Sequence, residues 1–303
     1  MNSVQYSPKQ IAEAMRVSES SVKRWCDRGI IPSVKTGGGH RRISVESLAQ
    51  FLRETKRTLL APEKLGVAPL DVVPSSAVRR VDVESNVSNA GCEAIVETFT
   101  NALLDGDEAA CRQIIQQAFL RNKSFTDVAA SIVCASMRRI GEIWENGHAD
   151  VLQERYGCEI CFRLVNELAQ YIPLPGAEAP LAIGCAPPGD QYQLPTHLVE
   201  LVLREAGWNA RSLGNNMALD RLLEVVVRHR PQLVWVSIST IEDRAAFVGA
   251  FNAFANQLPK GVFLVAGGRA MDDEMRPLLH YTAHCDNFHQ LAGLAATMLS
   301  RGR

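Results

Sequence analysis

The sequence contains no apolar run of membrane length, no large surplus of one charge and no ordered cysteine framework. A membrane-spanning helix needs about 20 consecutive, mostly apolar residues. A secretion signal needs an apolar stretch near the N-terminus, whereas polar residues follow Met1 directly. We therefore expect a cytoplasmic protein that contacts no membrane. The eight cysteines are irregularly spaced, which favours reduced thiols in apolar cores over disulfides.

The net charge of −1 at pH 7 hides an uneven distribution along the 303 residues. Residues 1–57 contain eleven Lys or Arg and five Asp or Glu, whereas the remainder contains twenty-one and twenty-eight. A basic segment attached to an acidic remainder is typical of a protein that binds nucleic acid. The length and the 47% hydrophobic content allow two or three globular domains.

Residues 7–28 have the pattern of two short helices joined by a turn. Ser7 and Ser18 are expected N-caps, and apolar residues recur behind each with helical period. Gly29 and Pro32 end the second helix. Its outward face would carry hydroxyl and cationic side chains suited to a DNA major groove. These candidate DNA contacts are Ser20, Ser21, Lys23, Arg24 and Arg28.

A glycine-rich reversal and a third helix complete the first domain, which we place at residues 1–58. Gly37–Gly39 allow two short strands to reverse. The tip of this wing would present His40, Arg41 and Arg42 to the phosphate backbone or the minor groove. A helix from Val45, with apolar residues on one face, would close the core.

The GGHRR wing, Trp25 and the RGIIP turn resemble the winged helix-turn-helix of the MerR and excisionase families. The resemblance implies that the domain binds a double-stranded DNA operator. A helical module that binds protein is the alternative. The long dimerising coiled coil of typical MerR proteins is missing. A single short recognition helix binds weakly, so we expect a homo-oligomer assembled through other parts of the chain.

Residues 59–89 contain prolines and serines without a sustained period, which predicts a linker. Residues 90–173 contain four amphipathic segments separated by short breaks, which predict a four-helix bundle. Cys158 and Cys161 form a CxxC within the fourth segment. Two thiols do not complete a tetrahedral metal site, so we expect no metal there.

Residues 178–303 alternate between short apolar strands and helical segments, which predicts a doubly wound parallel sheet of the Rossmann-like type. One of the expected helices covers residues 271–280. Ligands on such folds bind at the carboxyl ends of the strands. Those ends are expected at Gly189–Pro195, Ser237–Thr240 and Gly267–Gly268.

The bundle followed by this sheet resembles the cobalamin-binding module of methionine synthase. With the helix-turn-helix in front, the chain resembles the light-dependent CarH and LitR regulators. That family carries a Glu/Asp-x-His-x-x-Gly motif whose histidine is the lower cobalt ligand. Here Asp190, Tyr192 and Pro195 match its three fixed positions, so the histidine and the glycine are both replaced.

Other family positions are kept, and the resemblance implies that they contact the cofactor. Small residues would leave a slot between sheet and helices for the dimethylbenzimidazole tail: Ser237, Ser239, Gly267 and Gly268. Small residues that simply end strands are the alternative. Trp144 matches the tryptophan that caps the upper face, and Glu154 matches a carboxylate beside it. Glu145 and Arg155 stand where the family has histidines.

The replaced histidine weighs against cobalt ligation. Imidazole is an ordinary ligand for such metals, whereas a tyrosine phenol with a pKa of about 10 must first lose its proton. Tyr192 is therefore a poor ligand. We expect His197 on the surface of the following helix, and we expect Pro195 to stiffen the loop.

These observations favour a transcriptional regulator, not an enzyme, that works without cobalamin or with another ligand. One alternative is a regulator that still binds a corrinoid and senses light or cofactor supply. Another is a haem or bilin between Trp144 and the sheet, with Cys185, His148 and Tyr192 as candidate contacts. A closed apolar interface with Trp144 as core is a further alternative. The fused DNA-binding domain disfavours a corrinoid-dependent enzyme.

Overall fold

The structure is a computed structural model, and it describes residues 5–55, 57, 62–65, 87–122, 124–146 and 150–301. The chain divides into two compact units, Met1–Lys123 and Ser124–Arg303. Most of the expected linker, residues 59–89, lies outside the described residues. The expected domain boundaries stay predictions.

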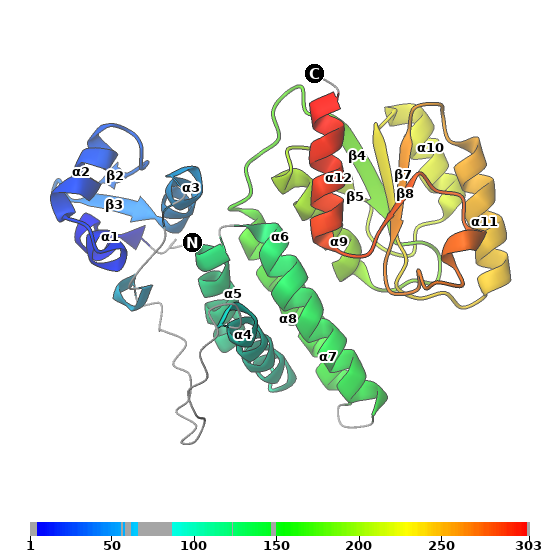
Figure 1. Cartoon of the computed structure of the whole chain (residues 1–303), viewed down its shortest axis with the longest axis horizontal. Coiled ribbons are helices and arrows are strands. Elements are labelled where there is room, and N and C mark those ends of the chain that lie inside the picture. Colours follow the sequence, from blue (N-terminus) through cyan, green and yellow to red (C-terminus); the bar gives the residue numbers. More distant parts are fainter. Residues whose placement is uncertain are drawn as a thin grey trace. The chain divides into compact units, whose positions relative to one another are not determined.

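The first unit begins with a small winged helix-turn-helix (Figure 1). Ser7 and Ser18 are N-caps, as expected, and Ser7 forms a capping box with Gln10. The antiparallel sheet has the order β1-β3-β2. The elements are β1 (Gln5–Tyr6), α1 (Pro8–Met15), α2 (Glu19–Asp27), β2 (Val34–Lys35), β3 (Arg41–Ser44), α3 (Val45–Thr55) and the short 3-10 helix η1 (Pro62–Leu65).

Apolar side chains from every helix of this domain meet in one core. Ile11, Val22 and Leu48 are completely buried. Trp25 packs against Phe51 with 5.0 Å between ring centroids. Burial of side chains of this size stabilises a small domain by about 1.5–3 kcal/mol each. The core therefore holds the exposed face of α2 in a defined orientation.

The four helical segments expected between residues 90 and 173 are all present. The first two, α4 (Val87–Leu104) and α5 (Glu108–Asn122), belong to the first unit. The third is one continuous stretch in the second unit, made of α6 (Phe125–Val128), the π-helical turn η2 (Ala129–Val133) and α7 (Cys134–Glu145). The fourth is α8 (Val151–Ala169). Among the described helices, none is long and apolar enough to cross a membrane.

The second unit contains a five-stranded parallel sheet with the order β5-β4-β6-β7-β8. Helices α9 and α12 cover one face, and α10 and α11 cover the other (Figure 1). This arrangement confirms the doubly wound sheet. The elements are β4 (Leu181–Cys185), α9 (Gln193–Glu205), β5 (Asn209–Ser212), α10 (Leu219–His229), β6 (Leu233–Ser237), α11 (Arg244–Gln257), β7 (Phe263–Gly267), β8 (Ala283–Cys285) and α12 (Phe288–Arg301).

The strand order reverses direction between β4 and β6, and ligands bind at such a switch point in open parallel sheets. An apolar core lies under α10 and α11 and includes Val234, Val236 and Phe251. Cys185, a candidate ligand contact, is buried in this core. It therefore packs on the face of the sheet that α10 and α11 cover.

Two local predictions in the second unit were wrong. The expected helix over residues 271–280 is reduced to the 3-10 turn η3 (Arg276–Leu278). Pro277 lacks an N–H donor and disfavours a helical conformation in the preceding residue. Pro195 does not stiffen a loop, because α9 begins at Gln193 and includes it. An N–H in the first turn has no acceptor within the helix, so proline is tolerated there.

Candidate functional site

The outward face of α2 carries most of the expected DNA contacts. The side chains of Lys23, Arg24 and Arg28 are exposed. Lys23 forms an ion pair with Glu19 at 2.7 Å, whereas Arg24 and Arg28 form no ion pair with other described residues. Ser20 and Ser21 share hydrogen bonds with the Ser18 hydroxyl at 2.9 and 2.8 Å. These short bonds hold the two serines at the start of the helix.

The wing is a tight reversal between β2 and β3. The His40 carbonyl accepts a hydrogen bond from the Thr36 N–H at 2.8 Å, and Gly39 has a φ of +77° that favours glycine. His40 is exposed and Arg42 is half-buried. Arg41 is 23% exposed and pairs with Asp27 of α2 at 2.5 Å. Arg41 therefore braces the wing against α2 in this structure.

A hollow of about 410 Å³ joins the start of α1 to the wing. Its cationic lining consists of Lys9, Lys23, Arg41 and Arg42, together with His40. Sequence reasoning missed Lys9. The available signal was its place in the first turn of α1, where a cation is unusual because the helix dipole favours negative charge. A phosphate bound in this hollow would offset the repulsion between the Lys9 side chain and the partial positive charge at the start of α1.

A second cavity, of about 850 Å³, lies in the second unit at the carboxyl ends of the strands. It is lined by residues of η2, α7, α8, α9, β6, β7, β8 and the start of α12. Ligand-binding cavities commonly have volumes of about 300–1,000 Å³. The cavity therefore occupies the place that the doubly wound sheet predicts for a ligand.

Four small residues expected at the tail slot all line this cavity: Ser237, Ser239, Gly267 and Gly268. Ser239 is 9% exposed, and its buried hydroxyl has no hydrogen-bond partner among the described residues. A Cβ atom at Gly268 would overlap the backbone of Ile238, and its φ is +120°. Packing between β6 and the loop after β7 therefore explains this glycine without a ligand.

Asp190 does not line the cavity, although we expected it to contact a cofactor. Its buried carboxylate accepts hydrogen bonds from the backbone N–H groups of Ser239 at 2.5 Å, Tyr192 at 3.0 Å and Thr240 at 3.4 Å. These bonds tie the loop after β4 to the end of β6. In this structure Asp190 positions backbone atoms around the switch point.

Tyr192 immediately precedes α9, and its half-buried side chain lines the cavity. The guanidinium carbon of Arg155 lies 5.9 Å from the ring centroid. Burial, and then the negative charge of Glu154, raise the pKa of Tyr192 above 10.0. The phenol therefore keeps its proton at neutral pH, which makes it an even poorer cobalt ligand than a free tyrosine.

Trp144 and Glu154 line the cavity from α7 and α8. The side chain of Trp144 is 47% exposed, which contradicts the alternative of a closed apolar interface with Trp144 as core. Glu145 lies beside Arg269, with 3.9 Å between charged atoms. Cys185 lies outside the cavity lining, and His148 lies outside the described residues. The described residues contain no cluster of His, Cys, Asp and Glu that could hold a metal ion.

His197 lies on α9, where we expected a surface residue, but its side chain is only 15% exposed. Its Nε2 lies 3.1 Å from Asn166 Oδ1 and its Nδ1 lies 3.3 Å from Glu200 Oε2. The imidazole also packs on Phe162, with ring centroids 5.1 Å apart. It therefore joins α8 to α9 and lies outside the cavity lining. Helical periodicity places His197 on α9 but does not show that α8 packs against this side.

Trp235 is a cavity residue that sequence reasoning missed. It lies on β6, is 2% exposed, and donates a hydrogen bond from Nε1 to Thr196 Oγ1 of α9 at 3.0 Å. A Cβ atom at Gly184 of β4 would overlap the indole. The ring therefore lies over Gly184, and Trp235 is one of the residues that line the cavity. Alternate residues of a strand point to the same face of the sheet. Trp235 lies two residues before Ser237, so the sequence does indicate that both residues share a face.

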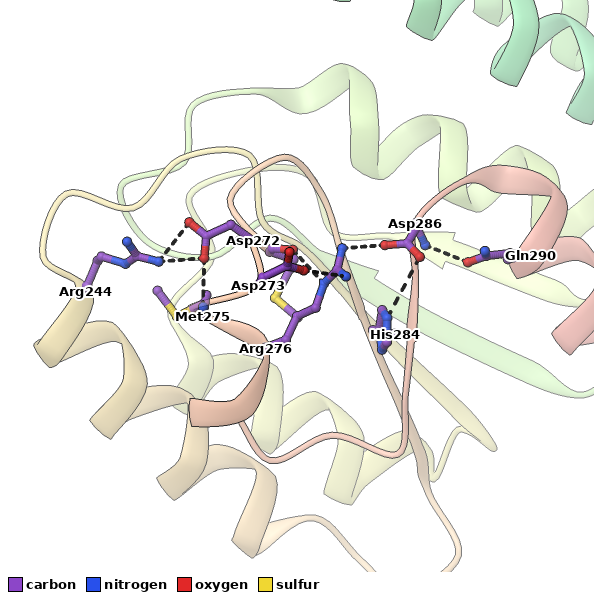
Figure 2. Close-up of polar contacts among 9 residues, drawn as sticks. Arg244, Asp272, Asp273, Met275, Arg276, His284, Asp286 and Gln290 are labelled. Carbon is purple, nitrogen blue, oxygen red and sulfur yellow. Dashed lines mark hydrogen bonds and ion pairs between the residues drawn. The ribbon is translucent and has the colours of Figure 1, made fainter.

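Ion pairs organise the segments that follow β7 and β8 at the edge of the cavity (Figure 2). Asp272 accepts hydrogen bonds from Arg244 at 2.7 and 2.9 Å. Arg276 pairs with Asp286 at 2.5 Å and with Asp273 at 3.2 Å. No motif in the sequence indicated these ion pairs, because they join the start of α11 and two loops that meet only in the folded chain.

Two family models match the chain. Residues 6–56 match a helix-turn-helix domain and residues 95–168 match a B12 binding domain. The second match crosses the division between the two compact units at Lys123. No match was found among curated protein sequences.

One solved structure shares the fold of the helical and sheet regions. The monomethylamine corrinoid protein of Methanosarcina barkeri is 17% identical, with a TM-score of 0.59 over 68% of this chain and 99% of that chain. The methanol:cobalamin methyltransferase complex MtaBC from the same organism is 14% identical, with a TM-score of 0.38 over 73% and 90% of the two chains. The chain joins a helix-turn-helix domain to a module of the B12-binding type.

Proposed function

We propose that this protein is a DNA-binding transcriptional regulator of the MerR and CarH type, and that its second unit does not hold cobalt through a histidine. The observation that carries the DNA-binding role is the set of exposed cations on α2 and on the wing of one winged helix-turn-helix. We further propose that it acts in the cytoplasm as a homo-oligomer, since one short recognition helix binds weakly by itself.

In this proposal α2 enters the major groove and the wing contacts the adjacent backbone or minor groove. The proposed contacts are Ser20, Ser21, Lys23, Arg24, Arg28, His40, Arg41 and Arg42, to which we add Lys9. Arg24 and Arg28 are ready to contact DNA, because neither pairs with another described residue. Arg41 pairs with Asp27, so it contributes by holding the wing in place as well as by its charge.

The test is fluorescence anisotropy with a labelled duplex from the region upstream of the protein's own coding sequence. We expect Arg24→Ala to weaken binding about tenfold. It should also reduce the slope of log affinity against log salt by about 0.9, which corresponds to one lost phosphate contact. Arg221→Ala is the matched control, because Arg221 is an exposed arginine on α10. Equal binding by the Arg24 and Arg221 variants would contradict the proposed interface.

The open cavity supports ligand binding by the second unit, but its residues do not fit histidine-ligated cobalamin. The family's ligand position carries Tyr192, whose raised pKa keeps it protonated. His284 supplies the cavity's one imidazole among the described residues. It comes from β8, three places from β4 in the sheet, and its Nε2 lies 3.9 Å from Asp286. We therefore assign no chemistry to a bound cobalt ion.

The charge of the cavity wall supports a corrinoid over a haem or a bilin as the alternative ligand. Three arginines line the cavity, namely Arg138, Arg269 and Arg276. Carboxylates outnumber them: Glu142, Glu145, Glu154, Asp272, Asp273 and Asp286. Haem and biliverdin carry ionised propionates that such a wall repels, whereas the side chains of the corrin ring end in neutral amides. A ligand of neutral or positive charge suits this cavity best.

We also propose that the protein is not an enzyme. The solved structures it resembles are named as a corrinoid protein and a methyltransferase complex. The helix-turn-helix domain supports a regulatory use of the same fold. Incubation with methylated amines or methanol and reduced cob(I)alamin, the methyl acceptor, should form no methylcobalamin above a protein-free control. Turnover that depends on Tyr192 or Trp144 would contradict this part of the proposal.

A further inference from the structure

Part of the second-unit cavity lies between the sheet and its covering helices, where the lining side chains are apolar. Leu194 and Leu198 of α9, Val265 of β7 and Leu291 of α12 line it. A flat aromatic ring fits such a space, because it can lie parallel to the sheet and exclude water on both faces. The sequence resemblance predicted this place as the slot for the base of a cobalamin tail.

The indole of Trp235 already extends into this space. Its ring lies over Gly184, where no Cβ atom competes for room, and is almost completely buried. The hydrogen bond from Nε1 to Thr196 Oγ1 fixes the ring between β6 and α9. Because the ring is anchored from both the sheet and the helix, a ligand that needs this volume must break a buried hydrogen bond.

Indole and benzimidazole are both fused bicyclic rings of nearly the same size. Protein interiors are close-packed, so one space of this kind does not accept both. We propose that the indole of Trp235 takes the place of the tail base within the protein itself, so that the cavity selects a corrinoid without a nucleotide base over cobalamin. This inference rests on the proposed corrinoid-binding alternative for the second unit and is independent of the DNA-binding role.

Ser239 gives independent support for a polar ligand in the same cavity. Ser239 lines the cavity, and its hydroxyl is buried without a hydrogen-bond partner among the described residues. An unsatisfied buried hydroxyl is unfavourable, so a bound ligand that supplies a carbonyl acceptor would remove the penalty. The amide groups around a corrin ring are acceptors of this kind. A corrin ring could therefore supply an acceptor for this hydroxyl without a benzimidazole base in the cavity.

The experiment compares two inert corrinoids that differ in the tail. Purified full-length protein is titrated in the dark with dicyanocobinamide, which has no base, and with cyanocobalamin, which has one. Bound ligand is measured by visible absorption after equilibrium dialysis. We expect the wild-type protein to bind dicyanocobinamide at least tenfold more tightly than cyanocobalamin. Trp235→Ala should open the space and reduce this preference at least fivefold.

Two matched variants test whether the volume of the ring is responsible. Trp235→Phe keeps an aromatic ring in the space, and Thr196→Val keeps the indole while removing its hydrogen-bond acceptor. Both should retain the preference for dicyanocobinamide. Circular dichroism and thermal melting check each fold. If Trp235→Ala does not fold, the wild-type comparison and the two conservative variants decide the question.

Equal affinity of the wild-type protein for both corrinoids would overturn the inference. An unchanged preference in folded Trp235→Ala would overturn it too, as would retention of neither corrinoid by any of the four proteins. The anisotropy assay with DNA separates the two proposals. Lost corrinoid binding with intact DNA binding would reject the ligand inference alone, whereas absent DNA binding with a retained preference would reject the regulator.

Discussion

Gly268 has a backbone conformation and a neighbour that both exclude a side chain. Its φ is +120°, and a Cβ atom would overlap the backbone of Ile238. The carbonyl of Ile238 also accepts a hydrogen bond from Ala270 N at 3.0 Å, so this backbone has little freedom to move away. A glycine that first suggests a ligand-binding loop is therefore required by the fold itself.

We expect Gly268→Ala to lower the free energy of unfolding by about 3 kcal/mol or more, because strain and overlap add. Urea unfolding followed by circular dichroism measures the change. Gly249→Ala on α11 is the control, since no atom lies within 4 Å of its expected Cβ position. Alanine there should stabilise the protein by up to about 1 kcal/mol. Similar stabilities of the two variants would refute the overlap argument.

Two residues that were both expected to contact a cofactor take different roles according to their hydrogen-bond partners. Asp190 is committed to three backbone N–H groups, whereas the Ser239 hydroxyl beside it has no partner among the described residues. The sequence singled out both residues as cofactor contacts. Only hydrogen-bond geometry distinguishes a residue that supports the cavity from one that is available to a ligand.

At the scale of elements, one carboxylate holds the start of the helix that forms a wall of the cavity. Glu205, the last residue of α9, accepts hydrogen bonds from the N–H groups of Phe125 at 2.6 Å and Thr126 at 2.8 Å. It also accepts from the hydroxyls of Thr126 and Ser124. These bonds satisfy N–H groups at the start of α6 that have no acceptor within the helix.

Glu205→Ala should destabilise the protein by about 2–3 kcal/mol, because it leaves these N–H groups without their acceptor. The continuous stretch from α6 to α7 also carries Trp144, so tryptophan fluorescence should change. Chemical denaturation gives the free energy. Glu224→Ala removes a carboxylate from an exposed pair with Arg221, and we expect a loss below about 0.5 kcal/mol. Comparable losses in both variants would contradict the capping role.

Most helices and strands could be predicted from local patterns. Ser7, Ser18 and the apolar period located α1 and α2, because a cap and its helix interact within a few residues. The segment around Pro277 was predicted to be a longer helix, because its apolar residues have helical spacing. The proline limits the helix to one short turn. Pro195 led to the opposite error. We expected it in a loop, whereas the first turn of a helix accepts proline.

At the scale of the whole molecule, buried thiols make the stability of the protein depend on pH in the alkaline range. Burial raises the pKa of Cys111, Cys158 and Cys185 from 9.0 to about 12. It raises the pKa of Cys134 and Cys285 to about 11. Their contribution to stability is complete below pH 9. It is lost as the pH rises from 9 towards 11–12, because thiols in the unfolded chain ionise first.

We therefore expect a lower free energy of unfolding at pH 10.5 than at pH 8, measured in urea with a reducing agent present. Cys185→Ala tests the cause, because Cys185 lies in the core beneath α10 and α11. The variant should be less stable at pH 8 but should lose less stability on going to pH 10.5. An equal loss in the variant and the wild-type protein would exclude this thiol as a source.

The sequence by itself determined most of the elements and the basic charge of residues 1–57. It also placed a tyrosine, Tyr192, where the resemblance to the CarH family leads us to expect a histidine. Each of these depends on residue identity or on spacing within a single helix or turn. Tertiary structure decided the Arg41 brace, the contacts of His197 with α8, the exposure of Trp144 and the position of Trp235 over Gly184. These features depend on which distant elements pack together, and the spacing of residues within one helix or strand does not indicate its packing partner.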